Sequence, residues 1–317
     1  MRSNRQMMKD AVTTDAITGT GKGGLLNPEQ ARKFISYMTD DTAFLKDTRL
    51  ERMDTYEKQL DFLLIGSRLI RKATEGQAPS ELAGAEFRRK ELRSVKVRLA
   101  ADITTEFAED NIERKEGQDR IARELAQQFG NDLADLMLNG DTAASGSDAS
   151  FLTIGDGIIK QAKSSTETHK VNTTGKTDYK GDIFPAMLSA MPNKFKRDRA
   201  NMRFYCSSTV ADAYIMSLTS RLTEMGDNIL VNGNLVKFLG IQLFPVEYMP
   251  DDVIILTNRL NLVSGVQRDM KVYSQFNQRK DLTEYTMYMR LDPGKIVWDD
   301  ALVIAYPVTA ASGGGGD

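Results

Sequence analysis

The chain has 317 residues, of which 41% are hydrophobic, enough to bury one large core or two smaller ones. Its 42 lysines and arginines nearly balance its 44 aspartates and glutamates, so the formal net charge is −2 and no bulk positive field would hold nucleic acid tightly. No apolar run reaches the roughly 20 residues of a membrane-spanning helix, and the charged N-terminus has no signal-peptide core, so we expect a soluble protein of the cytoplasm without membrane contact.

Residues 1–56, the first segment in chain order, are predicted to form an extended N-terminal arm. The glycine-rich start sustains no apolar period. The run Gly19–Gly24 superficially suggests a phosphate loop, but it lacks the spacing of that motif and no strand is predicted before it. A short amphipathic helix, the one expected anchor point, is marked by Ala31, Phe34, Ile35 and Met38.

Residues 57–101 are predicted to form an extended hairpin loop. An apolar run from Phe62 to Ile70 is followed, after a segment rich in glycine and proline, by an alternating run from Val95 to Leu99. A two-stranded ribbon of this kind is marginal alone in water, so it needs another surface to lie on. A second subunit is one candidate for that surface.

A long helix is predicted from about 105 to 139, within a segment that spans 102–204. Thr104 or Thr105 is its expected cap, and Asn139-Gly140 is its stop signal. At about 1.5 Å per residue it would be roughly 50 Å long, a spine for the fold. Gly117 and Gly130 mark where a bend or a break is expected. The helical stripe consists of Phe107, Ile112, Ile121, Leu125, Phe129, Leu133, Leu136 and Met137.

A second lobe rich in short strands is predicted for the rest of the chain. We expect polar surface connections at 142–150 and 163–180, and a disordered tail at 312–317. Helices are expected at 182–195 and from 209 to about 222, the latter capped by Ser208. Strands are expected at 202–206, 236–239, 242–246, 253–257, 261–264, 270–276, 285–291 and 296–305. The predicted class is α+β with a long central helix.

No catalytic, cofactor or metal site is predicted. Cys206 is the only cysteine, so no intrachain disulfide can form, and we expect it to be a small buried residue of a strand. His169 is the only histidine, and we expect an exposed loop residue without a nucleophile motif nearby. The pairs Asp251-Asp252 and Asp299-Asp300 are predicted turn formers, because adjacent residues of a strand point to opposite faces. A hydrolase using such acidic pairs and His169 is the alternative from another class.

Charge is segregated along the chain more clearly than any catalytic pattern. Residues 86–98 are mostly basic, whereas 106–116 are mostly acidic. Solvated faces with pairing inside one chain are one interpretation. The other is that the basic ribbon of one subunit lies on the acidic helix start of the next. The predicted interface residues are Arg88, Arg93, Lys96 and Arg98 on the ribbon, and Glu106, Glu109, Asp110 and Glu113 on the helix.

Three stretches carry a resemblance to a known family. They are Leu136-Met-Leu-Asn-Gly-Asp141 at the helix end, the strand and turn from Leu239 to Pro250 with Val253-Ile-Ile-Leu-Thr257, and the closing Trp298-Asp-Asp-Ala-Leu-Val-Ile-Ala-Tyr-Pro307. In this order, and over nearly the whole chain, the sequence resembles the major capsid proteins of tailed phages, which share the Hong Kong 97 fold.

The resemblance implies a division into domains. After the arm and the hairpin, it implies a peripheral domain at 102–204 that contains the spine helix. An axial domain is implied at 205–290, with a return strand of the peripheral domain at 291–310 and a tail at 311–317.

The resemblance also implies a function and partners. The chain would be a structural head protein that self-assembles into hexamers and pentamers of an icosahedral shell around double-stranded DNA. Its partners would be further copies of itself, a separate scaffolding protein, a portal, packaged DNA bound without sequence preference and a decoration protein. It would be assembled in the host cytoplasm and reside in the virion. The alternative within the same fold is an encapsulin-like nanocompartment that encloses enzyme cargo.

Overall fold

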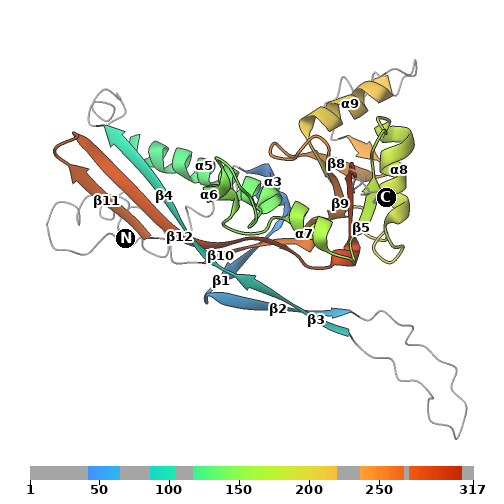
Figure 1. The fold of residues 1–317 in the computed structure, drawn as a ribbon, viewed down its shortest axis with the longest axis horizontal. Helices are drawn as coiled ribbons and strands as arrows, with labels where there is room; N and C mark the ends of the chain where they lie inside the picture. Colours follow the sequence, from blue (N-terminus) through green and yellow to red (C-terminus); the bar gives the residue numbers. More distant parts are fainter. Residues whose placement is uncertain (1–41, 65–85, 105–116, 220–235, 268–270, 309–317) are drawn as a thin grey trace, which may run out of the picture.

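The computed structural model describes residues 42–64, 86–104, 117–219, 236–267 and 271–308. This part of the chain contains helices, a five-stranded sheet, a six-stranded sheet and a separate two-stranded ribbon (Figure 1). The predicted α+β class is therefore confirmed.

The five-stranded sheet is built around one long strand, β12 (Leu282–Ile296), which has neighbours on both sides. β4 runs antiparallel to it along Leu282–Leu291 and β11 along Leu282–Tyr288, and β10 pairs with its last part. β1 is added to β10 as a parallel edge strand. The bounds of these four strands are β1 Arg49–Met53, β4 Val95–Thr104, β10 Leu262–Gln267 and β11 Lys271–Asn277.

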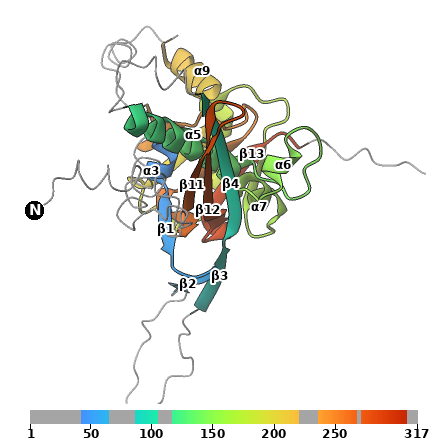
Figure 2. The ribbon, with the colours of Figure 1, turned by 90° about the vertical axis from the view of Figure 1, so that its left-hand side faces the viewer.

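The two-stranded ribbon is a hairpin of β2 (Glu57–Leu64) and β3 (Glu86–Arg93), which pair antiparallel along their whole lengths. Figures 1 and 2 show it extending away from both sheets. The prediction of a hairpin is correct, but its second strand is not the alternating run from Val95 to Leu99. That run belongs to β4, because Val97 and Leu99 find an apolar surface in the core of their own subunit.

The six-stranded sheet has the order β5-β13-β9-β6-β8-β7. β6 and β8 run parallel to each other, and β9 is antiparallel to β6 and β13. The central strands read as nearly continuous apolar runs, which is typical of a sheet covered on both faces. The strands are β5 His169–Asn172, β6 Met202–Cys206, β7 Lys237–Phe238, β8 Ile241–Pro245, β9 Ile254–Asn258 and β13 Leu302–Tyr306.

The two faces of this sheet belong to two different cores. Because side chains alternate along a strand, Phe204 and Leu256 lie in a core with the helices α8 and α9. Their sequence neighbours Tyr205 and Ile255 lie in the larger core with α5 and α7. The helices of the described residues are α3 Ala43–Asp47, α5 Gly117–Asn139, α6 Ala149–Leu152, α7 Ile158–Ser164, α8 Phe184–Ala190 and α9 Ser208–Thr219. Short π or 3-10 turns are η1 Tyr179–Ile183, η2 Arg259–Asn261 and η3 Asp299–Ala301.

The predicted spine helix is present as α5. It ends at Asn139, as the Asn-Gly stop signal predicts, and continues through Gly130 without a break. Its 23 residues make it about 35 Å long at 1.5 Å per residue. The rest of the predicted helix, including its threonine cap at 105 and the acidic residues up to 116, lies outside the described residues.

Several predicted boundaries are wrong. The boundary between 290 and 291 falls inside the single strand β12. The predicted strand 296–305 is two strands, β12 and β13, interrupted by η3. The end of the predicted arm is part of the folded body, because Phe44 and Leu45 are buried in the main core. The amphipathic arm helix and the glycine tail lie outside the described residues, and the names peripheral and axial stay a prediction.

Two local predictions are also corrected. His169 is predicted to lie in an exposed loop, but it is the first residue of β5. Residues 169–172 form this strand because they pair in parallel with β13. The helix cap is Ser207 and not Ser208, since Ser207 Oγ accepts the Val210 N–H at 3.3 Å. Cys206 is buried, as predicted. Across the described ranges, no helix is long and apolar enough to cross a membrane.

Candidate subunit interface

The β2–β3 hairpin has two chemically different faces. On the outer face, oppositely charged residues stand opposite each other across the strands. Arg89 Nε lies 2.8 Å from Asp61 Oδ1, and Arg93 Nε lies 3.4 Å from Glu57 Oε1. All four side chains are about half exposed or more, so each pair stabilises the hairpin by about 0.2–1 kcal/mol. The charges of this face are therefore largely paired within one chain.

The inner face joins the hairpin to the body. Leu60 and Leu92 are buried there with Met53, Val263 and Val297, in a small core separate from the two larger ones. These five residues come from the hairpin, β1, β10 and the residue that follows β12. The hairpin root is thus a joint between the ribbon and one edge of the five-stranded sheet.

Two lysines of the inner face hold the joint from either side. Lys58 Nζ forms an ion pair with Glu51 on β1. Lys90 Nζ lies 2.8 Å from Asp299 Oδ2 on η3. Burial alone would raise the pKa of Glu51, but hydrogen bonds from Lys58 and Arg49 outweigh it and lower that pKa. Glu51 is therefore an ionised partner of Lys58 at neutral pH.

A buried carboxylate completes the joint. Asp292 is 1% exposed, and its Oδ2 accepts the backbone N–H of Arg93 at 2.7 Å while its Oδ1 accepts that of Gly294 at 3.0 Å. Burial raises the pKa of Asp292, and these hydrogen bonds and Lys295 offset only part of that effect. Ser94, also fully buried, donates from Oγ to the Tyr56 carbonyl. The turn from β3 into β4 is therefore fixed by polar contacts from two other segments.

Side chains of the joint pack closely against the backbone of β10 at Gly265. A Cβ on Gly265 would lie 2.6 Å from Met53 Sδ, 3.2 Å from Asp292 Cβ and 3.5 Å from Leu92 Cδ1. A side chain at this position of β10 would push the hairpin root away from the sheet. Glycine fits this position because a Cβ has no room there, and not because the backbone has a positive φ.

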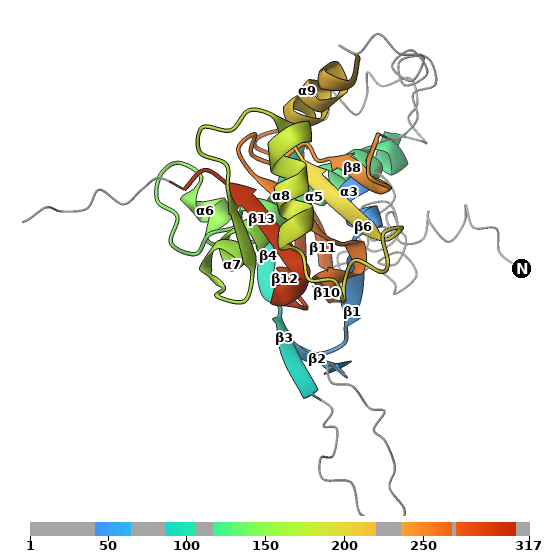
Figure 3. The same cartoon turned by 90° about the vertical axis from the view of Figure 1, so that its right-hand side faces the viewer.

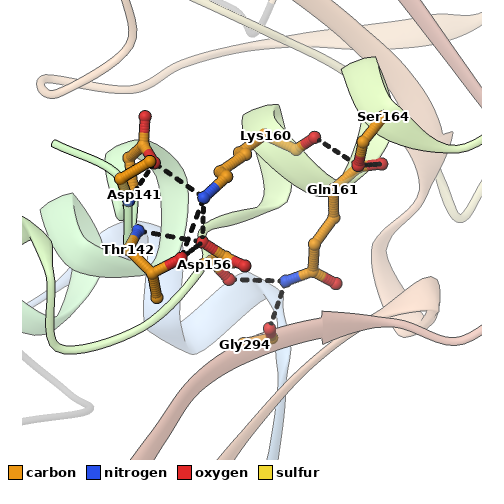
Figure 4. Close-up of polar contacts among 8 residues, drawn as sticks. Asp141, Thr142, Asp156, Lys160, Gln161, Ser164 and Gly294 are labelled. Carbon is orange, nitrogen blue, oxygen red and sulfur yellow. Dashed lines mark hydrogen bonds and ion pairs between the residues drawn. The ribbon is translucent and has the colours of Figure 1, made fainter.

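A second joint connects the end of α5 to β12 (Figure 4). Asp156 Oδ1 accepts the Thr142 N–H at 2.9 Å and pairs with Lys160, which also lies 2.7 Å from Asp141. Burial alone would raise the pKa of Asp156, but bonds from Lys160 and Thr142 lower it to about 2. Gln161 Nε2 donates at 2.8 Å to the Gly294 carbonyl on β12.

The same joint depends on three close glycine contacts. A Cβ on Gly140 would lie 2.3 Å from the Gly155 carbonyl oxygen. A Cβ on Gly155 would lie 2.4 Å from the side chain of Pro293, and one on Gly294 2.8 Å from that of Met137. The conspicuous Leu-Asn-Gly-Asp end of α5 is thus a packing feature. It ties the spine helix to the same Asp-Pro-Gly segment of β12 that holds the hairpin root.

The predicted interface residues do not lie on one ribbon. Arg88 and Arg93 belong to β3, whereas Lys96 and Arg98 belong to β4 in the five-stranded sheet. Lys96 Nζ lies 4.4 Å from the centre of the Tyr288 ring. The proposed acidic partners Glu106, Glu109, Asp110 and Glu113 lie outside the described residues, as does the side chain of Arg88.

The residues discussed as catalytic alternatives are dispersed. Asp299 and Asp300 turn to different lysines, Lys90 and Lys194. His169 Nε2 is buried without a hydrogen-bond partner among the described residues. No group of three or more His, Cys, Asp or Glu in the described ranges could hold a metal ion. Burial raises the pKa of Cys206 to about 12, so its thiol is not a ready nucleophile.

No protein-family model matches the sequence. The prophage capsid protein YqbE of Bacillus subtilis is 28% identical over 306 residues, 92% of this chain and 94% of the relative. A chain of the satellite phage P4 procapsid structure matches with a TM-score of 0.63 and 12% identity, covering 88% of this chain and 99% of that one.

A capsid chain of the cyanophage P-SCSP1u matches with a TM-score of 0.56 and 12% identity, over 85% of this chain and 89% of that one. The chain has the Hong Kong 97 fold of tailed-phage capsid proteins, and it is similar over nearly its whole length to a prophage capsid protein. The resemblance stated from the sequence is thereby confirmed. Asp292, Gly265 and Gly155 are the residues that sequence reasoning missed. Their only sequence signals are an Asp-Pro-Gly turn and single glycines, which do not reveal what they pack against.

Proposed function

We propose that the capsid protein forms hexamers and pentamers that close into an icosahedral shell around double-stranded DNA. The observation that carries the proposal is the hairpin, whose described strands β2 and β3 are joined to the body at the hairpin root and extend away from both sheets (Figure 1). A two-stranded ribbon is marginal in water, so it would be stabilised by lying on a neighbouring copy. The matches to phage capsids favour such a shell over one that encloses enzyme cargo.

The partners of this proposal follow from the same assignment. A separate scaffolding protein would direct shell size and a portal would occupy one vertex, with a decoration protein as a further partner outside. DNA contact would be sequence-independent, because the net charge is only −2. Assembly would take place in the host cytoplasm.

Purified full-length protein, incubated over a range of salt and protein concentrations, tests the proposal. Sedimentation and negative-stain microscopy should show closed shells or capsomer rings. A compact monomer under every condition would contradict it. The presence of terminase and portal genes beside the gene would separate a phage shell from an enzyme-filled compartment.

We also propose the contact predicted from the sequence, in which basic residues of 86–98 in one subunit meet acidic residues of 106–116 in the next. Arg93 already has carboxylate neighbours in its own chain, whereas Arg98 is an exposed residue of β4. Arg93→Glu with Arg98→Glu should impair assembly in low salt, where attraction is least screened. Adding Glu106→Arg with Glu109→Arg should partly restore it, and unimpaired assembly of the double variant would contradict the contact.

A further inference from the structure

The turn between β7 and β8 exposes a leucine in a conformation that disfavours it. Leu239 and Gly240 form a two-residue hairpin turn with φ of 47° and 86°. The left-handed region suits Asn, Asp or Gly at the first of these positions, because a Cβ crowds the following carbonyl. The Leu239 side chain is nevertheless 61% exposed. The left-handed backbone and the exposed apolar side chain are both unfavourable in the isolated subunit. A partner surface that covered Leu239 would remove the cost of exposing it to water.

Basic residues surround this turn. The connection from α8 to β6 lies against it, since Arg199 Nη1 donates to the Leu239 carbonyl at 3.1 Å. Lys194 is paired with Asp300, and Asp198 accepts from the amides of Asn201 and Asn258. No described residue forms an ion pair with Lys196, Arg197 or Lys237. We call this surface the basic end of the six-stranded sheet; it comprises Lys196, Arg197, Arg199 and Lys237, with Leu239 among them.

Carboxylates gather at the opposite end of the same sheet. Glu247, Asp251 and Asp252 follow β8, and Asp212 lies in α9, which follows β6. All four are exposed, and none pairs with a cation in the part of the chain that the structure describes. Asp182 on η1, which packs against α9, adds a further exposed carboxylate, with Lys180 as a basic neighbour. These five carboxylates form what we call the acidic end.

The strand directions separate the two ends. β6 and β8 run parallel, so the segments before them share one end of the sheet and the segments after them share the other. Figure 3 shows α9 at one end of the lobe and the connection from α8 to β6 at the other. Five residues of β8 at about 3.3 Å each place the ends about 17 Å apart. Opposite charges that cannot meet within one subunit can meet between copies arranged head to tail.

We propose that the basic end of the six-stranded sheet contacts the acidic end of the same sheet in a neighbouring copy, with Leu239 inside the contact. A contact between different surfaces is heterologous and closes into rings when the rotation between copies allows it. A two-fold dimer through either end would instead place like charges together. The inference rests on the proposed function, because these rings are its hexamers and pentamers.

Two complementary variants test the contact. Lys196→Glu with Arg197→Glu and Lys237→Glu makes both ends acidic, because one arginine then remains against three glutamates. Glu247→Lys with Asp251→Lys and Asp252→Lys makes both ends basic, because two carboxylates then remain against three lysines. Each variant alone should lose ring and shell formation at low salt. Mixed in equal amounts they should form hexamers, because every contact in an alternating ring joins opposite charges. They should not form pentamers, because an odd ring cannot alternate.

Mass photometry and negative-stain microscopy read out ring size. The matched control is Arg279→Glu with Arg290→Glu, two exposed basic residues of the five-stranded sheet and its β11–β12 connection that form no ion pair with a described residue. It should assemble like the wild type. Assembly of either charged-end variant alone, or failure of the mixture to form rings, would overturn the contact. A control as impaired as the variants would show that general charge, and not this surface, governs assembly.

Leu239→Gly provides a test that does not depend on charge. Glycine relieves the left-handed strain, so the melting temperature of the dissociated subunit should stay unchanged or rise, while the protein concentration needed for assembly should increase several-fold. Unchanged assembly would remove Leu239 from the contact. If the wild type itself never assembles, the proposed function fails; if it assembles and the variants match it, only this inference fails.

Discussion

The Oδ2 atom of Asp292 accepts a hydrogen bond from the backbone N–H of Arg93 at 2.7 Å, across 199 positions of sequence. Arg93 is the last residue of the hairpin, and Asp292 lies in β12 where its register with β10 shifts. The bond sets where the hairpin leaves the body. In the shell that we propose, the direction of the hairpin decides which neighbour it reaches, so this joint links subunit folding to assembly.

Asp292→Asn should destabilise the subunit. An amide has one oxygen acceptor where the carboxyl has two, so the N–H of Arg93 or Gly294 loses its partner inside the fold. A buried N–H left unsatisfied costs about 1–3 kcal/mol. Urea unfolding measures the change, and faster hydrogen exchange of the Arg93 amide would locate it at the hairpin root.

The pH dependence of that variant follows from the raised pKa of Asp292. A carboxyl with a raised pKa binds its proton more tightly in the folded state, so the wild type gains stability as pH falls below the folded pKa. The asparagine variant lacks this gain. The stability difference between the two should therefore narrow as pH rises through the folded pKa, and a difference that widens would contradict the assignment.

Gly265→Ala should destabilise the protein by about 1–3 kcal/mol, because the added methyl group overpacks the joint against Met53 and Asp292. The neighbouring Ser264 is a suitable control. It is fully buried and its Oγ has no hydrogen-bond partner among the described residues, so Ser264→Ala should leave the free energy of unfolding unchanged or raise it slightly. If both substitutions lowered the free energy of unfolding equally, the cause would be a general sensitivity of β10 to substitution and not the close contacts at Gly265.

Acid should weaken the joint between α5 and β12 through Asp156. Its pKa is lowered to about 2, so its contribution is present above the ordinary Asp value and is lost as pH falls through about 2. The side chain is 37% exposed, so solvent screening reduces the effect. The stability difference between the wild type and Asp156→Asn should shrink between roughly pH 4 and 2, measured by urea unfolding at each pH.

Cys206 should react with thiol reagents only after unfolding. The thiol is buried and its pKa is raised to about 12, so almost no thiolate exists at pH 8. Labelling should be slow in buffer and complete, at one thiol per chain, in denaturant. Rapid labelling of the folded subunit would contradict the burial of β6.

The sequence by itself determined the elements whose signals are local. The end of α5 at Asn139-Gly140, the strand Met202–Cys206 and the presence of a hairpin follow from apolar periodicity and a stop signal within a few residues. The resemblance over nearly the whole chain supplied the fold, because the order of the parts is itself sequence information. The charge pattern also suggested contacts between copies.

Only the tertiary structure decided which surface each of these elements meets. Val97 and Leu99 alternate as a hairpin strand would, yet they pair with β12, about 190 positions away, because that strand offers an apolar surface in the same subunit. The sequence left open whether the cations of 86–98 pair within one chain, and the hairpin register places a carboxylate opposite both Arg89 and Arg93. Asp292 carries no local signal because its role depends on Arg93. Such contacts join residues that lie far apart in sequence, and folding brings them together through shape and burial that no local pattern encodes.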